Sequence, residues 1–391
     1  MRVLIVTVGS RGDVAPYTGL AVRLREAGHA VTIATHRGHA GLVTGSGAAF
    51  RPLPGDQQTV LEAAAISIRA APGIVRYLDQ LGTALLDAAR SGVDALLTSA
   101  ATAPLATQIG AGLGVPVVGL HLQPAHPTRA FAPPVTSIGT LGPGNRPAAR
   151  FVQSVVDTFS APAVRRIRRE LGLRGRVPDH PVLYGFSPAV LPPPPDWPAD
   201  ARAVGYWWPA PAQWHPPASL VEFLAAGPAP VYVGLGSVGD GRAARRFTEL
   251  AVRACRRVGA RIVLRASAVA VPSGDDLFRV DDVPHERLFP RMAAVVHHGG
   301  AGTTAATLRA GVPSVPAPVQ ADQYLWARRS VALGVAPAAL RLRSSSLTSL
   351  ADVLRAAVAG DAYRERAEAL AEILATEDGA EAVVAAVGRL R

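Results

Sequence analysis

Residues 2–8 read Arg2-Val3-Leu4-Ile5-Val6-Thr7-Val8, and this run decides the fold. A continuous series of β-branched and other apolar residues is typical of a strand that is buried on both faces of a parallel sheet. A glycine-containing turn follows, and apolar residues then recur at helical spacing over residues 16–27. Residues 30–35 form the next apolar run. The pattern predicts a strand–helix–strand unit whose helix begins at Pro16, and therefore an α/β fold with a doubly wound parallel sheet.

The same alternation restarts in the second half of the chain. Residues 231–236 predict a strand that runs into a glycine turn, residues 243–259 predict a helix, and residues 293–298 predict a further strand. Prolines crowd residues 188–217, and because proline interrupts helices and central strands, we expect a stiff linker there. The pattern predicts two strand–helix domains, whose ligands would bind beyond the carboxyl ends of the strands.

The composition excludes several classes of function. The 391 residues include 40 basic and 29 acidic side chains, a net charge of +11, and every basic residue is Arg. The absence of Lys excludes a phosphate-binding loop ending in Gly-Lys-Ser/Thr, as well as Schiff-base chemistry. The single Cys255 excludes an internal disulfide and a cysteine metal cluster. The arginines are spread along the chain and no nucleic-acid-binding motif accompanies them, so we expect no nucleic acid as partner.

The apolar segments are short. The longest stretch without Asp, Glu or Arg, residues 95–128, is interrupted by Pro104, Gly110 and Gly114, whereas a membrane span needs about 20 mostly apolar residues. The N-terminal run leads into a polar turn and not into a small-residue cleavage site, so we expect no signal peptide and a cytoplasmic location. Residues 165–169 carry four arginines, which predict a solvated helix face or, as the alternative, a peripheral contact with a membrane surface.

Residues 296–304 carry the most informative motif, Val296-His297-His298-Gly299-Gly300-Ala301-Gly302-Thr303-Thr304. An apolar strand ends in two histidines, and a glycine-rich turn then opens a helix. Glycines let the backbone approach a ligand closely, and a helix N-terminus offers unpaired N–H groups and the positive end of the helix dipole. The motif predicts a phosphate cradle in which a histidine and a threonine hydroxyl take part. The alternative is a tight turn with a threonine as the N-cap of the helix.

Asp322 and Gln323 follow a further predicted strand, residues 314–317. A carboxylate accepts hydrogen bonds and an amide both accepts and donates them, so the pair suits the recognition of sugar hydroxyls. The alternative is that Asp322 only caps a helix expected over residues 324–331. The position of the pair shortly after the phosphate cradle favours binding.

At these motifs the chain resembles family 1 glycosyltransferases of the GT-B fold, in which two Rossmann-like doubly wound domains face an interdomain cleft. The resemblance rests on residues 298–303, on the Asp322-Gln323 pair, and on Gly9-Ser10-Arg11-Gly12-Asp13. Residues 283–290 and 34–36 are similar to sterol 3β-glucosyltransferases, and the chain is also similar to bacterial natural-product (antibiotic) glycosyltransferases.

The resemblance implies how the chain is divided. We expect an N-terminal acceptor-binding domain at residues 1–195 and a proline-rich linker at residues 196–217. A C-terminal nucleotide-sugar-binding domain is expected at residues 218–370, and a final helix that packs back on the N-terminal domain at residues 371–391. The helical pattern at the C-terminal end is expected to break near Gly360 and Gly379.

The resemblance also implies a donor site drawn from several parts of the chain. His298 with the backbone of Gly300, Gly302 and Thr303 is expected to hold the pyrophosphate, and Asp322 and Gln323 the sugar hydroxyls. The further donor-binding residues that it implies are Ser237 and Val283 beside the nucleotide, and Ser10, Arg11 and Gly12 toward the diphosphate.

Asp13 occupies the position of the catalytic base in this resemblance. Many members have a His there, supported by an Asp, whereas this chain has Asp13 itself and has Ser99 in place of the supporting Asp. A carboxylate can take the proton of an acceptor hydroxyl, and we expect nearby Arg11 to favour the charged form of Asp13. His298 and the helix N-terminus would stabilise the departing diphosphate, so neither a metal nor a cofactor is expected. The alternative role of Asp13 is that of a helix cap.

The function implied is inverting, metal-independent transfer of a sugar from a UDP- or TDP-linked donor to a hydroxyl of a hydrophobic natural product, such as a polyketide, macrolide or glycopeptide. The alternatives are a sterol or lipid glucosyltransferase that uses UDP-glucose, a non-catalytic activator of another enzyme, and a sugar-nucleotide epimerase. His121, Gln123 and Arg129 lie after a predicted strand and are expected to contact the acceptor. Its pocket is expected at residues 50–76 and 123–145.

Overall fold

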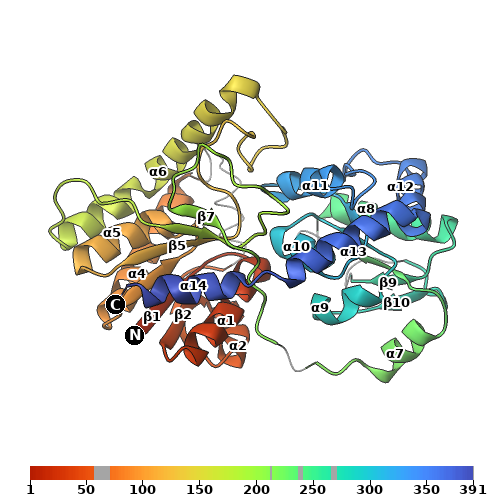
Figure 1. Cartoon of the computed structure of the whole chain (residues 1–391), viewed down its shortest axis with the longest axis horizontal. Coiled ribbons are helices and arrows are strands. Elements are labelled where there is room, and N and C mark those ends of the chain that lie inside the picture. Colours follow the sequence, from red (N-terminus) through yellow and green to blue (C-terminus); the bar gives the residue numbers. More distant parts are fainter. Residues whose placement is uncertain (57–70, 212–213, 237–240, 266–270, 391) are drawn as a thin grey trace. The chain divides into compact units, whose positions relative to one another are not determined.

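The computed structural model describes residues 1–56, 71–211, 214–236, 241–265 and 271–390. The chain divides into two compact units (Figure 1). Unit 1 contains Met1–Pro133, Thr140–Pro211 and Glu377–Arg391, and unit 2 contains Pro134–Gly139 and Ala212–Thr376. Residues 196–217, expected to be a linker, therefore belong to unit 1 as far as Pro211.

Unit 1 is built on a parallel sheet that has seven strands among the described residues. In the order of their pairing, these are β3 (Ala49–Leu53), β2 (Ala30–His36), β1 (Arg2–Val6), β4 (Ala95–Thr98), β5 (Val117–His121), β6 (Val182–Tyr184) and β7 (Ala201–Ala203). Every pairing is parallel. This order places β1 near the middle of the sheet, where a strand is covered on both faces and its side chains are therefore apolar.

Strand β1 is buried on both faces because its side chains alternate between them. Val3 and Ile5 pack with α1 (Arg11–Glu26) and α14 (Gly379–Gly388). Leu4 and Val6 pack on the other face, in a core that includes residues of α4 (Ala71–Arg90), α5 (Ala103–Leu113) and α6 (Asn145–Glu170). The short helical elements in the described part of unit 1 are η1 (Arg37–His39), α2 (Ala40–Gly45) and η2 (Gly142–Gly144). Helices therefore cover both faces of the sheet, and the predicted doubly wound arrangement is confirmed.

Unit 2 has the same architecture with five parallel strands among its described residues. Their order is β10 (Leu277–Arg279), β9 (Ile262–Leu264), β8 (Val231–Gly234), β11 (Ala294–His297) and β12 (Ser314–Pro316). One face packs on α8 (Arg242–Arg257) and α12 (Leu347–Ala359), and the other on α7 (Ala218–Ala225), α9 (His285–Leu288) and η4 (Phe289–Arg291). The other helices are α10 (Ala301–Arg309), α11 (Gln323–Ala332) and α13 (Asp361–Ala375).

The strand register of unit 2 brings three loops together. His297, the last residue of β11, is the register partner of Gly234 in β8 and of Pro316 in β12. Because the strands are parallel, their carboxyl ends lie at the same edge of the sheet. The loops that carry Gly236, His298 and Asp322 therefore start from neighbouring points.

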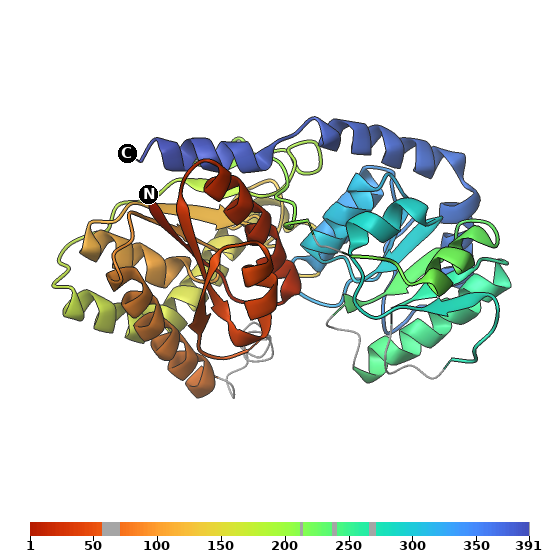
Figure 2. The same cartoon turned by 90° about the horizontal axis from the view of Figure 1, so that it is seen from below.

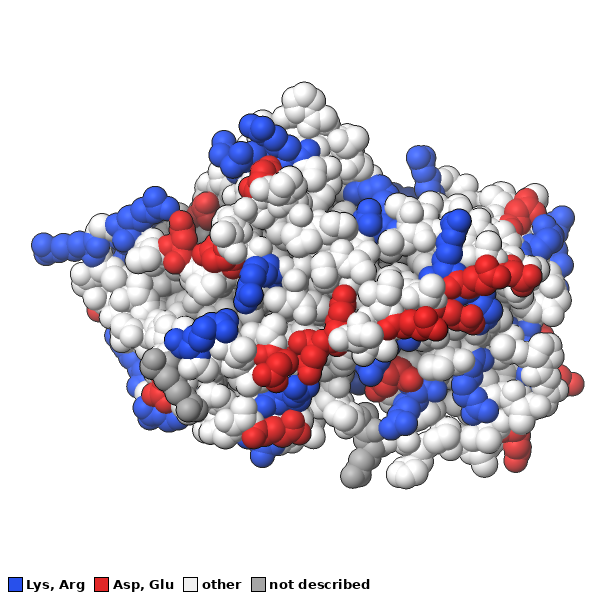
Figure 3. Space-filling view, in the orientation of Figure 1, with Lys and Arg blue, Asp and Glu red and all other residues white. Residues whose placement is uncertain are grey.

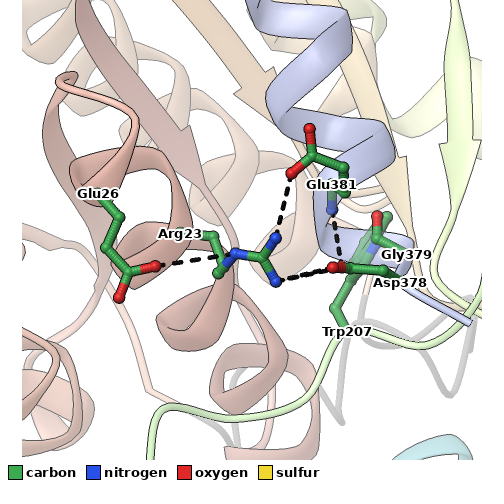
Figure 4. Close-up of polar contacts among 6 residues, drawn as sticks. All are labelled: Arg23, Glu26, Trp207, Asp378, Gly379 and Glu381. Carbon is green, nitrogen blue, oxygen red and sulfur yellow. Dashed lines mark hydrogen bonds and ion pairs between the residues drawn. The ribbon is translucent and has the colours of Figure 1, made fainter. Parts of the chain in front are cut away.

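Helix α14 packs against α1 within unit 1, and Figure 2 shows the two helices side by side. Val383 and Val387 are buried in the core that α1 and β1 share. The indole N–H of Trp207 donates to the carbonyl oxygen of Gly379 at 3.1 Å. In Figure 4, Arg23 of α1 reaches the carboxylates that begin α14, at 3.0 Å from Asp378 and 3.1 Å from Glu381. Apolar and polar contacts thus both attach α14 to the rest of unit 1.

Two local expectations are corrected by the structure. Helix α1 begins at Arg11, ahead of Pro16, because Ser10 is its N-cap and the Asp13 carboxylate accepts from the Ser10 backbone N–H at 2.8 Å. Pro16 lies inside the helix.

The proline-rich interval, residues 188–217, is not wholly irregular, because it contains β7. This strand lies at the edge of the sheet, where neighbouring prolines are tolerated. The helical pattern breaks at Gly360 and again before Gly379, as predicted.

Charged side chains are unevenly distributed over the face drawn in Figure 3. Acidic side chains gather along α13, where the exposed ones are Asp361, Glu365, Glu368 and Glu372. Arginines gather over α6, where Arg150, Arg165 and Arg169 are exposed. No helix in the described part of the chain has both the length and the apolar character needed to cross a membrane.

Replacing Trp207 with Ala should lower the free energy of unfolding of unit 1 by about 3–5 kcal/mol, because it empties a core position and removes the hydrogen bond to Gly379. Urea unfolding followed by far-UV circular dichroism measures the change. Phe151→Ala is the matched control, because Phe151 is 69% exposed and its truncation leaves no cavity. Equal effects of the two substitutions would contradict the anchoring role of Trp207.

Candidate active site

The glycine turn after β11 brings the two motifs of unit 2 together. β11 ends at His297, Gly299 adopts φ +79°, and α10 begins at Ala301. A β-carbon at Gly299 would lie 2.9 Å from the carbonyl oxygen of Gln323. Only glycine allows both the left-handed backbone conformation and this close approach. The turn and the Asp322-Gln323 pair therefore lie side by side.

The imidazole ring of His298 lies between two glycines. A β-carbon at Gly236, whose φ is +62°, would lie 2.8 Å from His298 Cε1, and a β-carbon at Gly300 would collide with His298 Nε2. His298 Nδ1 is buried and has no hydrogen-bond partner among the described residues. Burial, with a smaller contribution from the positive charge of Arg265, lowers the pKa of His298 to about 4. At neutral pH the ring is therefore uncharged, and it contributes a hydrogen-bonding nitrogen instead of a positive charge.

His297 has a different role from its neighbour. Its ring is fully buried; Nδ1 accepts from the Gly299 N–H at 3.1 Å, and Nε2 lies 2.7 Å from Ser314 Oγ. Because Nδ1 accepts and burial lowers the pKa to about 3, the neutral ring carries its proton on Nε2 and donates it to Ser314. His297 thus ties the glycine turn to β12. The sequence motif did not separate the two histidines, although side-chain alternation along the predicted strand 293–298 would place them on opposite faces.

The N-terminus of α10 follows this turn directly and has no side-chain cap among the described residues. Gly300 is the N-cap residue, in place of the threonine weighed as an alternative, and no described side chain hydrogen-bonds as its cap. The first N–H groups of a helix have no intrahelical partner, so Gly302 and Thr303 in the first turn present backbone donors together with the positive end of the dipole. Thr304 Oγ1 is buried and has no partner among the described residues. The arrangement can bind an anionic oxygen.

Asp322 and Gln323 stand at the start of α11. Asp322 is the N-cap residue, but its carboxylate accepts from the indole N–H of Trp326 at 2.7 Å and makes no capping hydrogen bond. The Oε1 atom of Gln323 accepts from the backbone N–H groups of Val319 and Gln320, at 2.9 and 3.0 Å. Hydrogen bonds within the protein therefore orient both side chains of the pair. Ala321, just before it, has φ +51°, the only positive value for a non-glycine residue in the described chain.

For two expected donor residues of unit 2, binding stays a prediction. Ser237 lies outside the described residues. Val283 is half-buried and packs against the apolar core that contains Tyr232 and Phe289. Its contact with a nucleotide stays a prediction.

Asp13 lies in unit 1 at the carboxyl end of β1. Its Oδ2 atom accepts from both the backbone N–H and the hydroxyl of Ser10, each at 2.8 Å. A β-carbon at Gly9, whose φ is +134°, would lie 2.5 Å from the same oxygen, so only glycine fits there. His39 Nε2 lies 3.1 Å from the Gly9 carbonyl oxygen. The carboxylate is thus held in one orientation by a tight turn.

The electrostatics of Asp13 correct one expectation. Burial raises the pKa of the carboxyl group, and the hydrogen bonds from Ser10 and the nearby His39 lower it only in part. We expected Arg11 to favour the charged form; instead, desolvation dominates, and the net direction is toward the protonated form. Arg11 and Gly12 are exposed in the first turn of α1. Their contact with a diphosphate, like that of Ser10, stays a prediction.

Of the residues expected to contact the acceptor, Gln123 and Arg129 lie after β5 in unit 1, whereas His121 is the last residue of the strand itself and not part of the loop. His121 is buried against the Tyr184 ring, with a centroid distance of 5.7 Å, and neither of its ring nitrogens has a described partner. Gln123 is half-buried. The side chain of Arg129 is exposed, while its backbone N–H donates to Asp196 at 2.9 Å. The expected pocket segment 123–145 is divided, because Pro134–Gly139 belongs to unit 2.

Two family descriptions match the chain. Residues 3–95 match the glycosyltransferase family 28 N-terminal domain, and residues 252–390 match the C-terminal domain of erythromycin biosynthesis protein CIII-like proteins. The O-mycaminosyltylonolide 6-deoxyallosyltransferase of Streptomyces fradiae is 34% identical over 97% of this chain and 95% of its own. The sterol 3-beta-glucosyltransferase of Arabidopsis thaliana is 31% identical over 99% of this chain.

The chain spans 65% of the Arabidopsis relative, and only 27% of a sterol 3-beta-glucosyltransferase of Cryptococcus neoformans that is 32% identical to it. Among solved structures, the glycotransferase of kitacinnamycin superposes with a TM-score of 0.73 at 21% identity, over 100% of this chain and 98% of its own. Streptomyces SsfS6 in complex with thymidine diphosphate superposes with a TM-score of 0.69 at 21% identity, over 100% and 99%.

These similarities, with two parallel-sheet units each covered by helices, define the class: the chain belongs to the glycosyltransferases, and its fold is GT-B. Within that class, the chain is similar over nearly the full length of both chains to the Streptomyces fradiae 6-deoxyallosyltransferase, and it is similar to the sterol glucosyltransferases over part of their length.

Proposed function

We propose that this chain transfers a sugar from a nucleoside diphosphate-sugar to a hydroxyl group of a hydrophobic natural product, with inversion at the anomeric carbon and without a metal ion. The observation that carries the proposal is the His298 ring between Gly236 and Gly300, beside the uncapped N-terminus of α10 and the Asp322-Gln323 pair. This arrangement offers donors for a diphosphate next to polar groups suited to a sugar.

The diphosphate is the leaving group of the proposed reaction. As the bond between the anomeric carbon and the diphosphate oxygen breaks, negative charge develops on that oxygen. The neutral His298 ring and the backbone N–H groups of Gly302 and Thr303 are fixed donors for this charge. They do the work for which many transferases use a divalent cation, which is why we propose a reaction without a metal.

Asp13 is the proposed general base. Its carboxylate takes the proton of the acceptor hydroxyl while the hydroxyl oxygen attacks the anomeric carbon from the side opposite the leaving diphosphate, and attack from that side inverts the configuration. The two hydrogen bonds from Ser10 to Oδ2 orient the carboxylate. The capping arrangement at α1 and the catalytic role are compatible, because both bonds from Ser10 engage the same oxygen.

The donor is proposed to be UDP- or TDP-linked, and the acceptor a polyketide, macrolide or glycopeptide-like compound. The full-length similarity to an antibiotic glycosyltransferase and the thymidine diphosphate bound by SsfS6 support this choice. A sterol or lipid acceptor with UDP-glucose is the second candidate, supported by the partial similarity to sterol glucosyltransferases.

A non-catalytic activator and a sugar-nucleotide epimerase are less favoured. An activator has no need for a diphosphate cradle, and an epimerase needs an acid and a base at the sugar ring itself. Slow hydrolysis of a nucleotide-sugar by the purified protein without acceptor would exclude the activator.

Thermal denaturation with UDP, TDP, GDP and ADP, in the presence of a metal chelator, tests the proposal. Ligand at about 100 times its Kd stabilises the native state by about 2.7 kcal/mol, so UDP or TDP should raise the Tm by several degrees. The same protein without nucleotide is the reference. No shift with any nucleotide would contradict the proposed donor site.

Gly300→Ala should weaken nucleoside diphosphate binding about tenfold, because the added methyl group collides with the His298 ring, and overpacking costs about 1–3 kcal/mol. Gly241→Ala is the matched control: both glycines are helix N-caps with extended backbone, at φ −63° and −74°, but Gly241 has open space around it. Isothermal titration calorimetry compares the two. Equal affinities would show that the His298 ring position does not matter.

A further inference from the structure

We propose that Trp326 is a positioning residue that holds the Asp322 carboxylate ready for the sugar, so that the protein distinguishes a nucleotide-sugar from the bare nucleoside diphosphate. The inference rests on the proposed function, because it assumes that Asp322 contacts the sugar. It adds a residue that neither the sequence motifs nor the resemblance singled out.

The contact is between two residues one turn apart on α11. Trp326 is only 1% exposed and is among the largest fully buried side chains of the chain. Its Nε1–H donates to Asp322 Oδ2 at 2.7 Å. The backbone around the tryptophan is also tied down, because its carbonyl oxygen accepts from the Ser330 hydroxyl at 3.0 Å. Close packing around the buried ring restricts its movement, so the N–H is a well-positioned donor.

This hydrogen bond decides between the two roles that an aspartate has at a helix start. An N-cap aspartate usually turns its carboxylate to the backbone N–H groups of its own first turn. Asp322 is the N-cap of α11 but makes no such bond. Its carboxylate accepts from the indole N–H instead, so the side chain of Asp322 does not act as the cap of α11.

The contacts of Gln323 also support the interpretation that the pair is oriented for a sugar. Two backbone N–H groups fix its Oε1, so the amide nitrogen, which donates only, points the opposite way. Asp322 accepts and Gln323 donates. An acceptor beside a donor matches two sugar hydroxyls, one that donates and one that accepts, whereas the diphosphate lacks hydroxyl groups to donate to Asp322.

Trp326→Phe tests the inference, because it removes the N–H and keeps an aromatic ring in the core. We expect the KM for the nucleotide-sugar to rise about tenfold, while the Kd for the nucleoside diphosphate stays within about twofold. Leu325→Val is the matched control, since Leu325 is a buried neighbour on α11 and its shortening loosens the packing without touching Asp322. A control that gives the same tenfold rise would reduce Trp326 to a packing residue and overturn the inference.

A double-substitution cycle separates action through Asp322 from a direct effect. In an Asp322→Ala background, Trp326→Phe should no longer change the ratio of nucleotide-sugar to nucleoside diphosphate affinity. An undiminished effect in that background would overturn the inference.

A measurement on the unmodified protein covers the case in which Trp326→Phe does not fold. The chain has 5 Trp residues, and the indole N–H resonance of Trp326 can be assigned by its displacement in Asp322→Asn. It should move when a nucleotide-sugar is added and stay in place with the nucleoside diphosphate alone. Movement with both ligands, or with neither while both bind, would overturn the inference. Failure of both ligands to bind would instead overturn the proposed function on which it rests.

Discussion

Asp13→Asn should lower the rate of sugar transfer about a thousandfold, within the range that a general base contributes. The amide keeps the shape of the carboxylate and can still accept from Ser10, but it cannot take a proton from the acceptor hydroxyl. Steady-state transfer to an accepted substrate measures the loss, and nucleoside diphosphate binding should be unchanged. Asp94→Asn is the control, because Asp94 also accepts a backbone N–H, from Arg2 at 2.6 Å, but belongs to no site. Transfer at the wild-type rate by Asp13→Asn would end the base assignment.

The raised pKa of Asp13 makes a second prediction for the same residue. As a base it must be ionised, so kcat/KM should fall as the pH falls through a pKa above the usual 3.8 of an Asp side chain. The stability of the fold has the opposite pH dependence. The protonated carboxyl group contributes stability in full at pH values below its pKa in the unfolded chain, and this contribution is lost as the pH rises through its pKa in the folded protein. At neutral pH the buried charge is a cost, so Asp13→Asn should raise the Tm. A lower Tm at pH 7 would show that the Ser10 bonds outweigh burial.

His298→Ala should lower kcat/KM about a hundredfold, the effect of removing one fixed donor from a site of developing negative charge. Its pKa of about 4 means that the ring acts as a neutral hydrogen-bonding group at pH 7. His298→Asn, which keeps a neutral N–H donor, should therefore recover part of the loss.

The comparison of the two variants separates two mechanisms. If His298 acted as a cation, His298→Asn would be as impaired as His298→Ala. Donor kinetics unchanged in both would remove His298 from the site.

Much of the fold could be predicted from the sequence because the strands are buried. In β1, residues 3–6 are apolar without interruption, with Val3 and Ile5 on one face and Leu4 and Val6 on the other, which is typical of a strand in a parallel sheet. The start of α1 could not be predicted, because a proline is a strong local signal for the first turn of a helix and Pro16 stands near the true start. The helix begins earlier because Ser10 and Asp13 together form its N-terminal capping box. β7 escaped notice because its three residues lie among prolines.

In the candidate site, too, some residues could be recognised from a sequence motif and others only from the folded structure. The glycines and the Asp322-Gln323 pair were recognisable because each serves a backbone or ligand need at a fixed spacing. Trp326 was not, because an apolar residue at helical spacing predicts only core packing. The pKa of Asp13 also had the opposite direction from the one expected, because burial depends on the whole turn and not on the neighbouring Arg11.

The anchoring of α14 on unit 1 has a consequence for how the protein is made. Because unit 2 ends at Thr376, the ribosome synthesises the whole of unit 2 before it reaches Val383 and Val387. Until then, the apolar surface of α1 and Trp207 that α14 covers stays exposed, although the strands of unit 1 are complete. A nascent chain paused before residue 377 should therefore present this surface to chaperones, and the surface should close once α14 has emerged.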